Sequence, residues 1–87
     1  MKLVCFINLF TYNARLHKVD ADDNMEFISE IPVDNLAESL AAAGSLNGIN
    51  QISLIGAPVF AEVLVPEIIE YAQTKFGNND LIVEVIK

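Results

Sequence analysis

The sequence predicts one small α/β domain with a mixed sheet and two helices. Short apolar segments rich in β-forming residues recur near the N-terminus, and two later segments with helical periodicity are separated by a single short apolar segment. At 87 residues the chain has the size of one domain, spanning residues 1–87. We therefore expect the element order βββαβαβ, which excludes a ferredoxin-like order because only one strand separates the helices.

The N-terminal third favours three consecutive strands. Lys2–Phe10 is apolar on both alternating sides, which is typical of an interior strand covered on both faces. Thr11–Ala14 supplies turn-tolerant residues, and Arg15–Val19 can return as the second strand of a hairpin. After an acidic turn, Met25–Ile31 is predicted as a third strand, with an irregular approach to a helix as the alternative.

The next segment favours a short helix. Asp34 or Asn35 can cap its N-terminus, and with Asn35 as the cap Glu38 would complete a capping box. Gly44 or Gly48 would end the helix. Its buried stripe is expected to comprise Leu36, Ala37, Leu40 and Ala41.

The remaining chain predicts a strand, a helix and a final strand. Gln51–Ile55 is short and apolar, and Pro58 suits the first turn of a helix. Pro66 removes a hydrogen-bond donor, so we expect this helix to kink or restart there. Gly77 favours a helix end, and Leu81–Ile86 favours the last strand.

The charge distribution excludes one large class of partners. The formal net charge is -7, and Val19–Thr74 contains no Lys or Arg. Because nucleic-acid affinity depends largely on Lys and Arg neutralising phosphates, we expect no direct nucleic-acid binding. An acidic surface of this kind keeps an apolar domain soluble, and it is compatible with a basic protein partner.

An uncharged segment, Ser39–Ala61, has the length of a membrane span. Six of its residues are Ser, Asn or Gln, which favours a protein core over a membrane. The N-terminal apolar run is interrupted by Asn8 and is interpreted as a strand, not a signal peptide. The single cysteine, Cys5, excludes an internal disulfide, and we expect a cytoplasmic protein without membrane contact.

The candidate chemical sites are weak. Asp20, Asp22, Asn24 and Glu26 alternate like the start of a calcium loop, but the glycine and the final glutamate of that loop are missing. His17 and Cys5 are the only residues of their kinds and are expected to be structural. We therefore predict no metal, no cofactor and no catalytic residue, and we favour a protein that is not an enzyme.

The loop between the fourth strand and the second helix is a possible anion site. Gly56 and Ala57 would present backbone N–H groups at a helix N-terminus, where the helix dipole is positive. Pro58 has no N–H and no Lys lies nearby in the sequence, so a plain turn is the favoured alternative.

The element order resembles the ribonuclease H-like superfold, which also underlies the actin-like ATPases. The resemblance covers nearly the whole chain and implies a three-stranded meander followed by strands joined by helices. It would place catalytic carboxylates in the first strand and near the end of the fourth. Here the first position is Asn8 and QISLIGA has no acid, so the resemblance implies the superfold without its catalysis.

Right-handed crossovers advancing in one direction would place both helices on one face of this sheet and leave the other bare. Hydrophobic residues make up 53% of the chain and the mean hydropathy is +0.41. Leaving an apolar sheet face in water would cost roughly 1.5–3 kcal/mol per large side chain. We therefore expect an interface comprising Val4, Phe6, Phe10, Ile82 and Ile86.

Three functions are compatible with these features. The leading hypothesis is a non-catalytic protein-interaction or assembly module, acting as a homo-oligomer or a small subunit of a complex. The second is an acidic inhibitor that mimics nucleic acid toward a basic protein. The third is a reduced nucleotide- or anion-binding domain using Gly56 and Ala57. The acidic patch of the second hypothesis comprises Asp20, Asp22, Asp23, Glu26 and Glu30.

Overall fold

The computed structural model describes residues 1–87 and has the predicted element order βββαβαβ. It confirms a single domain with a mixed sheet and two helices. The elements are β1 (Lys2–Asn8), β2 (Asn13–Val19), β3 (Met25–Pro32), α1 (Leu36–Ala42), β4 (Gln51–Ile55), α2 (Pro58–Phe76) and β5 (Ile82–Ile86).

The five strands form one sheet in the order β3-β2-β1-β4-β5. β2 is antiparallel to both β1 and β3, whereas β4 is parallel to β1 and β5 is parallel to β4. The longest strand at an edge is β3, which is confirmed as a strand throughout residues 25–32. β1 lies in the centre, as its apolar character on both sides predicts.

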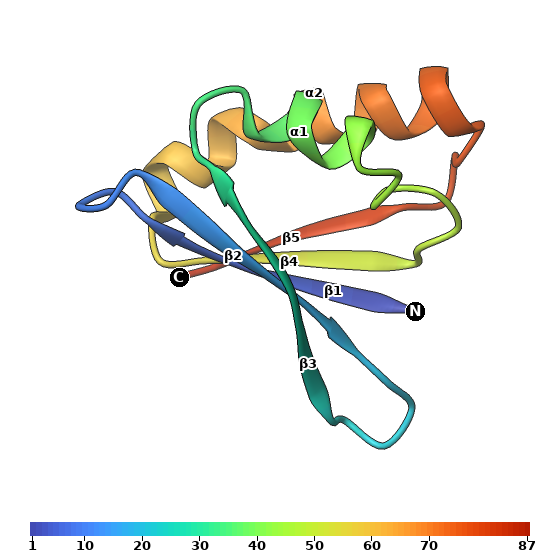
Figure 1. Ribbon diagram of the computed structural model, residues 1–87. Helices are drawn as coiled ribbons and strands as arrows, with labels where there is room; N and C mark the ends of the chain where they lie inside the picture. Colours follow the sequence, from blue (N-terminus) through green and yellow to red (C-terminus); the bar gives the residue numbers. More distant parts are fainter.

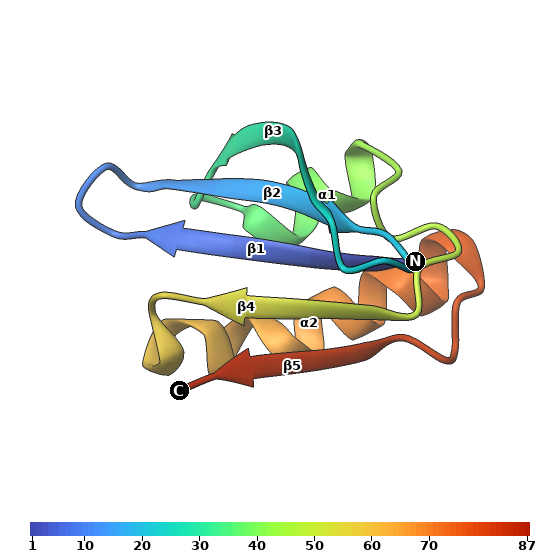
Figure 2. The ribbon, with the colours of Figure 1, turned by 90° about the horizontal axis from the view of Figure 1, so that it is seen from below.

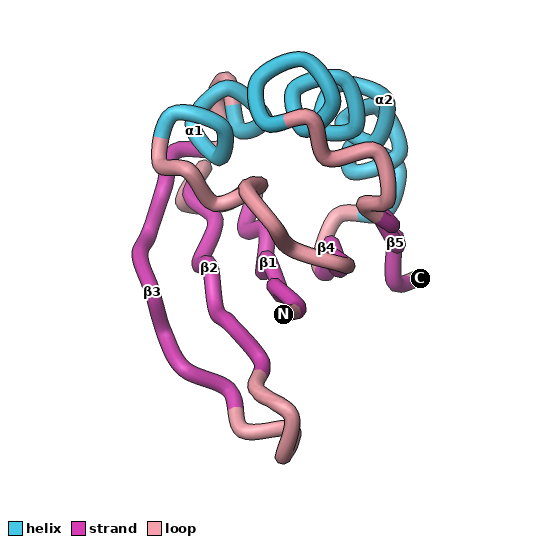
Figure 3. Tube along the Cα trace, turned by 90° about the vertical axis from the view of Figure 1, so that its right-hand side faces the viewer, coloured by secondary structure: helices cyan, strands magenta, loops and turns pink.

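Both helices cover the same side of the sheet, as Figures 1 and 3 show. α1 connects β3 to β4 and α2 connects β4 to β5, so both crossovers run toward the β5 edge. Figure 2 views the sheet from the opposite side and shows the strands in front of both helices. The second face of the sheet therefore has no covering layer.

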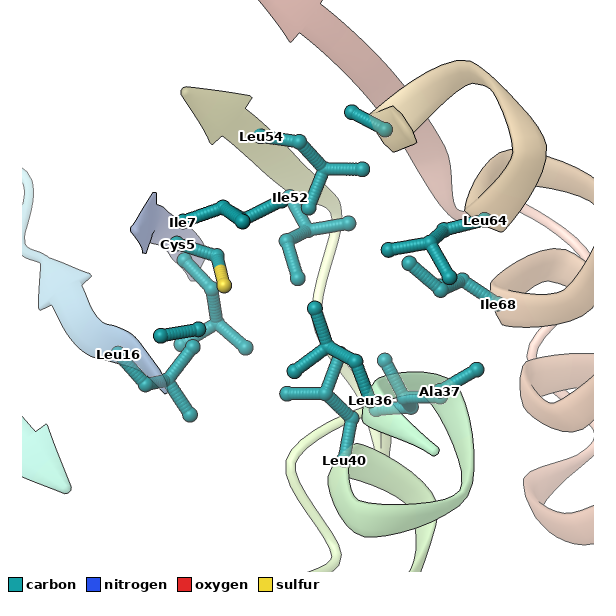
Figure 4. Packing of buried hydrophobic residues seen from close by; sticks show 14 of the residues in the cluster. Cys5, Ile7, Leu16, Leu36, Ala37, Leu40, Ile52, Leu54, Leu64 and Ile68 are labelled. Carbon is teal, nitrogen blue, oxygen red and sulfur yellow. The ribbon is translucent and has the colours of Figure 1, made fainter. Parts of the chain in front are cut away.

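The core lies between the sheet and the helices and consists of 20 buried residues, none of them polar or charged. Much of it comes from the uncharged segment 39–61, where Leu40, Leu46, Ile52 and Leu54 are fully buried. That segment therefore supplies a large part of the core, although about as many of its residues are exposed as are buried. Figure 4 shows Cys5, Ile7, Leu16, Ile52 and Leu54 of the strands facing Leu36, Leu40, Leu64 and Ile68 of the helices.

Helix α1 begins at the predicted cap but without the predicted capping box. Asn35 is the N-cap residue, yet its side chain caps nothing because its φ of 57° lies in the left-handed region. The helix ends where Gly44 adopts a φ of 71° and donates its N–H to the Ala41 carbonyl.

Helix α2 runs without interruption through Pro66, so the expected restart does not occur. Its buried residues have helical spacing on both sides of Pro66, and the proline itself is exposed on the other side. The packing of this continuous buried stripe therefore stabilises the helix, although Pro66 cannot donate a backbone hydrogen bond. Gly77 ends the helix, as predicted, with a φ of 62°. The stripe comprises Ala61, Leu64, Ile68 and Ala72.

Strand β1 ends at Asn8, two residues earlier than the sequence predicts. The Asn8 side-chain oxygen accepts the backbone N–H groups of Phe10 and Thr11 at 2.9 and 3.3 Å. These two hydrogen bonds start the turn at Asn8, so Phe10 does not join the strand. Phe10 is fully exposed in that turn and does not share the strand face of Val4 and Phe6.

Candidate functional site: the open sheet face

The side of the sheet that faces away from the helices is called here the open sheet face. Its members follow from strand alternation, because Leu3, Cys5 and Ile7 of β1 point into the core. The registers between strands extend this alternation across the sheet. The open sheet face comprises Lys2, Val4, Phe6, Arg15, His17, Val19, Met25, Phe27, Glu30, Gln51, Ser53, Ile55, Ile82, Glu84 and Ile86.

Three rings form a cluster in this face. The His17 ring lies 5.3 Å from the Phe6 ring at 90° and 5.5 Å from the Phe27 ring at 68°. The Arg15 guanidinium carbon lies 5.1 Å from the centre of the Phe27 ring. These edge-to-face and cation–π arrangements hold the side chains before any partner arrives, which reduces the entropy lost on binding.

His17 is the one residue with a buried side-chain polar atom that lacks a partner. Its Nδ1 atom is buried and accepts or donates no hydrogen bond, since apolar rings lie on either side. The ring therefore acts as part of the apolar surface of β2. Sequence reasoning assigned it no role because its two aromatic neighbours lie on other strands.

The opposite end of the open sheet face is apolar with one hydrogen-bonded pair. Ile82 and Ile86 of β5 are 61% and 38% exposed, which is high for isoleucine in a strand. Between them, Glu84 accepts a 2.6 Å hydrogen bond from the Gln51 amide of β4. This pairing leaves the two isoleucines as the projecting side chains of the edge.

The structure places four of the five predicted interface residues on the open sheet face. Val4 and Phe6 are partly covered by neighbouring side chains, while Ile82 and Ile86 are exposed. Phe10 is a correction, because it lies in the turn beyond β1, and we leave it out of the proposed interface. Phe27, exposed by 48%, was missed, although its alternation within β3 is the signal that could have found it.

The predicted acidic patch is divided between two places. Asp20, Asp22, Asp23 and Glu26 surround the turn between β2 and β3, where Lys18 pairs with Glu26 at 3.3 Å. Glu30 lies farther along β3, opposite Arg15 of β2. Figures 1 and 3 show the β2–β3 hairpin projecting beyond the sheet on the side away from the helices.

The Asp20 side chain organises this turn through hydrogen bonds to the backbone. Its Oδ1 atom accepts the backbone N–H groups of Asp22 and Asn24, each at 2.9 Å. No three His, Cys, Asp or Glu side chains are grouped as metal ligands. The alternating acids therefore form a polar turn whose shape is fixed by Asp20.

These bonds are expected to show in the titration of the Asp20 carboxyl. The backbone N–H of Asn24 is the main cause that lowers its pKa below the usual 3.8. A pKa lowered by folding stabilises the folded state above pH 3.8, and this contribution is lost as the pH falls through the folded value. An NMR titration of the carboxyl carbon should give a midpoint below 3.8, and a midpoint at or above 3.8 would contradict the turn geometry.

The loop at Gly56 and Ala57 has a structural explanation. Gly56 has a φ of 110°, and a Cβ atom added there would collide with the backbone carbonyl oxygen of Ile7. Ala57 is buried, and its carbonyl accepts the Ala61 N–H as the first bond of α2. Glycine is therefore required by the close approach of β1, and anion binding at this loop stays a prediction of the sequence.

Cys5 and His17 do not form a catalytic pair. They lie on neighbouring strands, but Cys5 points into the core and His17 lies in the open sheet face. Burial raises the pKa of the Cys5 thiol to about 12, so the thiolate needed for nucleophilic attack is scarce at neutral pH. This environment is that of a structural cysteine.

The helical side carries its own group of acids. A pocket of about 350 Å³ between α1 and α2 is lined by Glu38, Glu67 and Glu70, together with Asn35, Tyr71 and Thr74. No basic residue lines it. Two molecules approaching through their helices would therefore bring like charges together.

Comparisons with known proteins assign no family to this chain. A scan against models of protein families found no match, and searches of curated proteins and of solved structures found no similar protein. Neither α1 nor α2 has the combination of length and apolar character that crossing a membrane requires.

Proposed function

We propose that the protein is a non-catalytic interaction or assembly module that binds another protein chain through the open sheet face, as a homo-oligomer or a small subunit of a complex. The observation that carries this proposal is an uncovered sheet face with a preorganised aromatic cluster across β1, β2 and β3. Phe27 of this cluster is exposed at the β3 edge, and exposed Ile82 and Ile86 add apolar side chains at the β5 edge. Contiguous apolar surface of this kind marks interaction sites on small domains.

Native mass spectrometry of the tagged protein, isolated from its source cells, tests this proposal. We expect a complex of two or more chains that is lost in Ile82→Asp, because a partner that covers β5 would have to bury the introduced charge. Val59→Asp is the matched control, since Val59 is 85% exposed on α2 and lies on the helical side. A bare monomer for the unmodified protein would overturn the proposal.

A second candidate function is an acidic inhibitor of a basic protein. The projecting hairpin favours it, because Asp20, Asp22 and Asp23 are all exposed at its end. The double variant Asp22→Asn/Asp23→Asn keeps the Asp20 turn and should weaken such a complex mainly at low salt. Binding to a basic nucleic-acid enzyme that does not change with salt would count against this function.

We further propose that the domain is a catalytically inactive member of the ribonuclease H-like superfold. The strand order β3-β2-β1-β4-β5, with only β2 antiparallel, supports the resemblance drawn from the element order. The resemblance expects a catalytic carboxylate in the middle of the first strand, but Lys2–Asn8 contains no acid, and Asn8 at its end caps a turn. Addition of Mg²⁺ or Mn²⁺ should therefore neither stabilise the protein nor give nuclease activity.

A further inference from the structure

The open sheet face lacks a layer that sheets of this type normally have. β1, β4 and β5 are parallel neighbours with apolar residues on both sides. Sheets made only of parallel strands almost always have both faces covered, usually by helices. The parallel half of this mixed sheet is covered on one face only (Figure 2), which leaves its other face open to a second layer from another chain.

A helix suits this face better than a strand does, whether the strand lies across the face or pairs with an edge of the sheet. A strand lying across apolar side chains would leave its own N–H and C=O groups unpaired, whereas a helix satisfies them internally. Strand addition at the β3 edge is disfavoured by the irregularity at Ile28, where the register between β2 and β3 shifts. The aromatic cluster instead offers side-chain contacts suited to an apolar helix stripe.

A second copy of this chain is a poor occupant for two reasons. Each copy carries a net charge of -7, so association of two copies is opposed by charge repulsion. The β2–β3 hairpin also projects on the side of the open sheet face, and Figure 2 shows its end in front of β1. If two open sheet faces approached each other, their projecting hairpins would collide before the two sheets came into contact.

The charges around the open sheet face select a basic partner. The face itself carries two basic residues, Lys2 and Arg15, and two acidic ones, Glu30 and Glu84, so their charges sum to zero. The hairpin end then adds an excess of negative charge on the side where a partner would lie. That excess comes from Asp20, Asp22 and Asp23, with Glu26 already paired to Lys18.

The geometry points to a basic amphipathic helix of another protein as the occupant of the open sheet face. Its apolar stripe would cover Phe6, His17 and Phe27, and its Lys or Arg side chains would approach the acidic end of the β2–β3 hairpin. This inference rests on the proposed function and names the partner's chemistry. A helix of about 18 residues is about 27 Å long, and the whole molecule measures 33 × 29 × 23 Å, so a helix of this length can extend across the molecule.

The probe for this inference is a synthetic peptide of about 18 residues with leucines on one side of the helix and lysines on the other. A peptide with glutamates in place of the lysines is its control. Fluorescence anisotropy at low salt should show saturable one-to-one binding of the lysine peptide and none of the glutamate peptide. Raising the salt to about 0.5 M should weaken the binding at least severalfold.

Two variants locate the binding site. Phe27→Ser should weaken binding of the lysine peptide about tenfold, because Phe27 is an exposed ring of the aromatic cluster and contacts both His17 and Arg15. Phe10→Ser should leave the affinity unchanged, since Phe10 is fully exposed in the β1–β2 turn. Circular dichroism of both variants establishes that each remains folded. Asp22→Asn/Asp23→Asn should reduce the salt dependence without removing the binding.

Each contrary outcome has a distinct meaning. Absence of saturable binding, or equal weakening by Phe27→Ser and Phe10→Ser, overturns the inference. A dimer of the protein alone that is lost in Phe27→Ser overturns it in favour of a second copy, while the proposed interaction function stands. A monomer that binds neither the peptide nor any chain from its source cells contradicts both.

Discussion

Replacing Gly56 with alanine is expected to lower the free energy of unfolding by about 3 kcal/mol or more. The added Cβ would collide with the backbone carbonyl of Ile7, and backbone atoms cannot move aside as a flexible side chain can. The φ of 110° is also strained for any residue with a side chain. Urea denaturation followed by circular dichroism measures the loss.

Gly48→Ala is the matched control for this change. Gly48 also has a positive φ, 73°, but an added Cβ would meet nothing within 4 Å. Only the cost of the left-handed backbone remains, about 1 kcal/mol. Equal losses in the two variants would mean that β1 and the Gly56 loop are not in close contact, and the structural explanation for Gly56 would then fail.

Replacing Leu54 with alanine is expected to cost about 3 kcal/mol, within a range of about 2 to 5. Leu54 is fully buried in β4 and lies between Cys5 of β1 and Val85 of β5. Its removal would leave a cavity against the helices, because strands on both sides hold the backbone in place. For a domain of this size the melting temperature should fall by about 12 °C or more.

Leu9→Ala is the matched control for Leu54→Ala, because it makes the same substitution at an exposed position. Leu9 lies in the turn after β1 and is 48% exposed, so the same substitution should cost less than about 1 kcal/mol. Differential scanning calorimetry of the two variants gives the comparison directly. Similar melting temperatures for both would contradict the placement of Leu54 in the core.

The secondary structure was largely predictable because local signals are strong in this chain. All seven elements occur in the predicted order, and Gly44 and Gly77 end the two helices as expected. The errors arose where one local signal competed with another. Asn8 ended β1 early by capping a turn, and the buried stripe of α2 outweighed the effect of Pro66.

The candidate site was only partly predictable. The bare face followed from the handedness of the crossovers, and Val4, Phe6, Ile82 and Ile86 lie on it as expected. The aromatic cluster could not be found in the same way. Phe6, His17 and Phe27 belong to three strands, and their contact depends on two registers, one of which shifts at Ile28.

The sequence by itself determined the element order, the apolar core and the acidic turn, because each depends on residues a few positions apart. Only the tertiary structure decided which side chains meet in the open sheet face and that the β2–β3 hairpin projects on that side. Strand register and sheet twist bring together residues that are distant in the chain. The proposed partner site is a product of that packing.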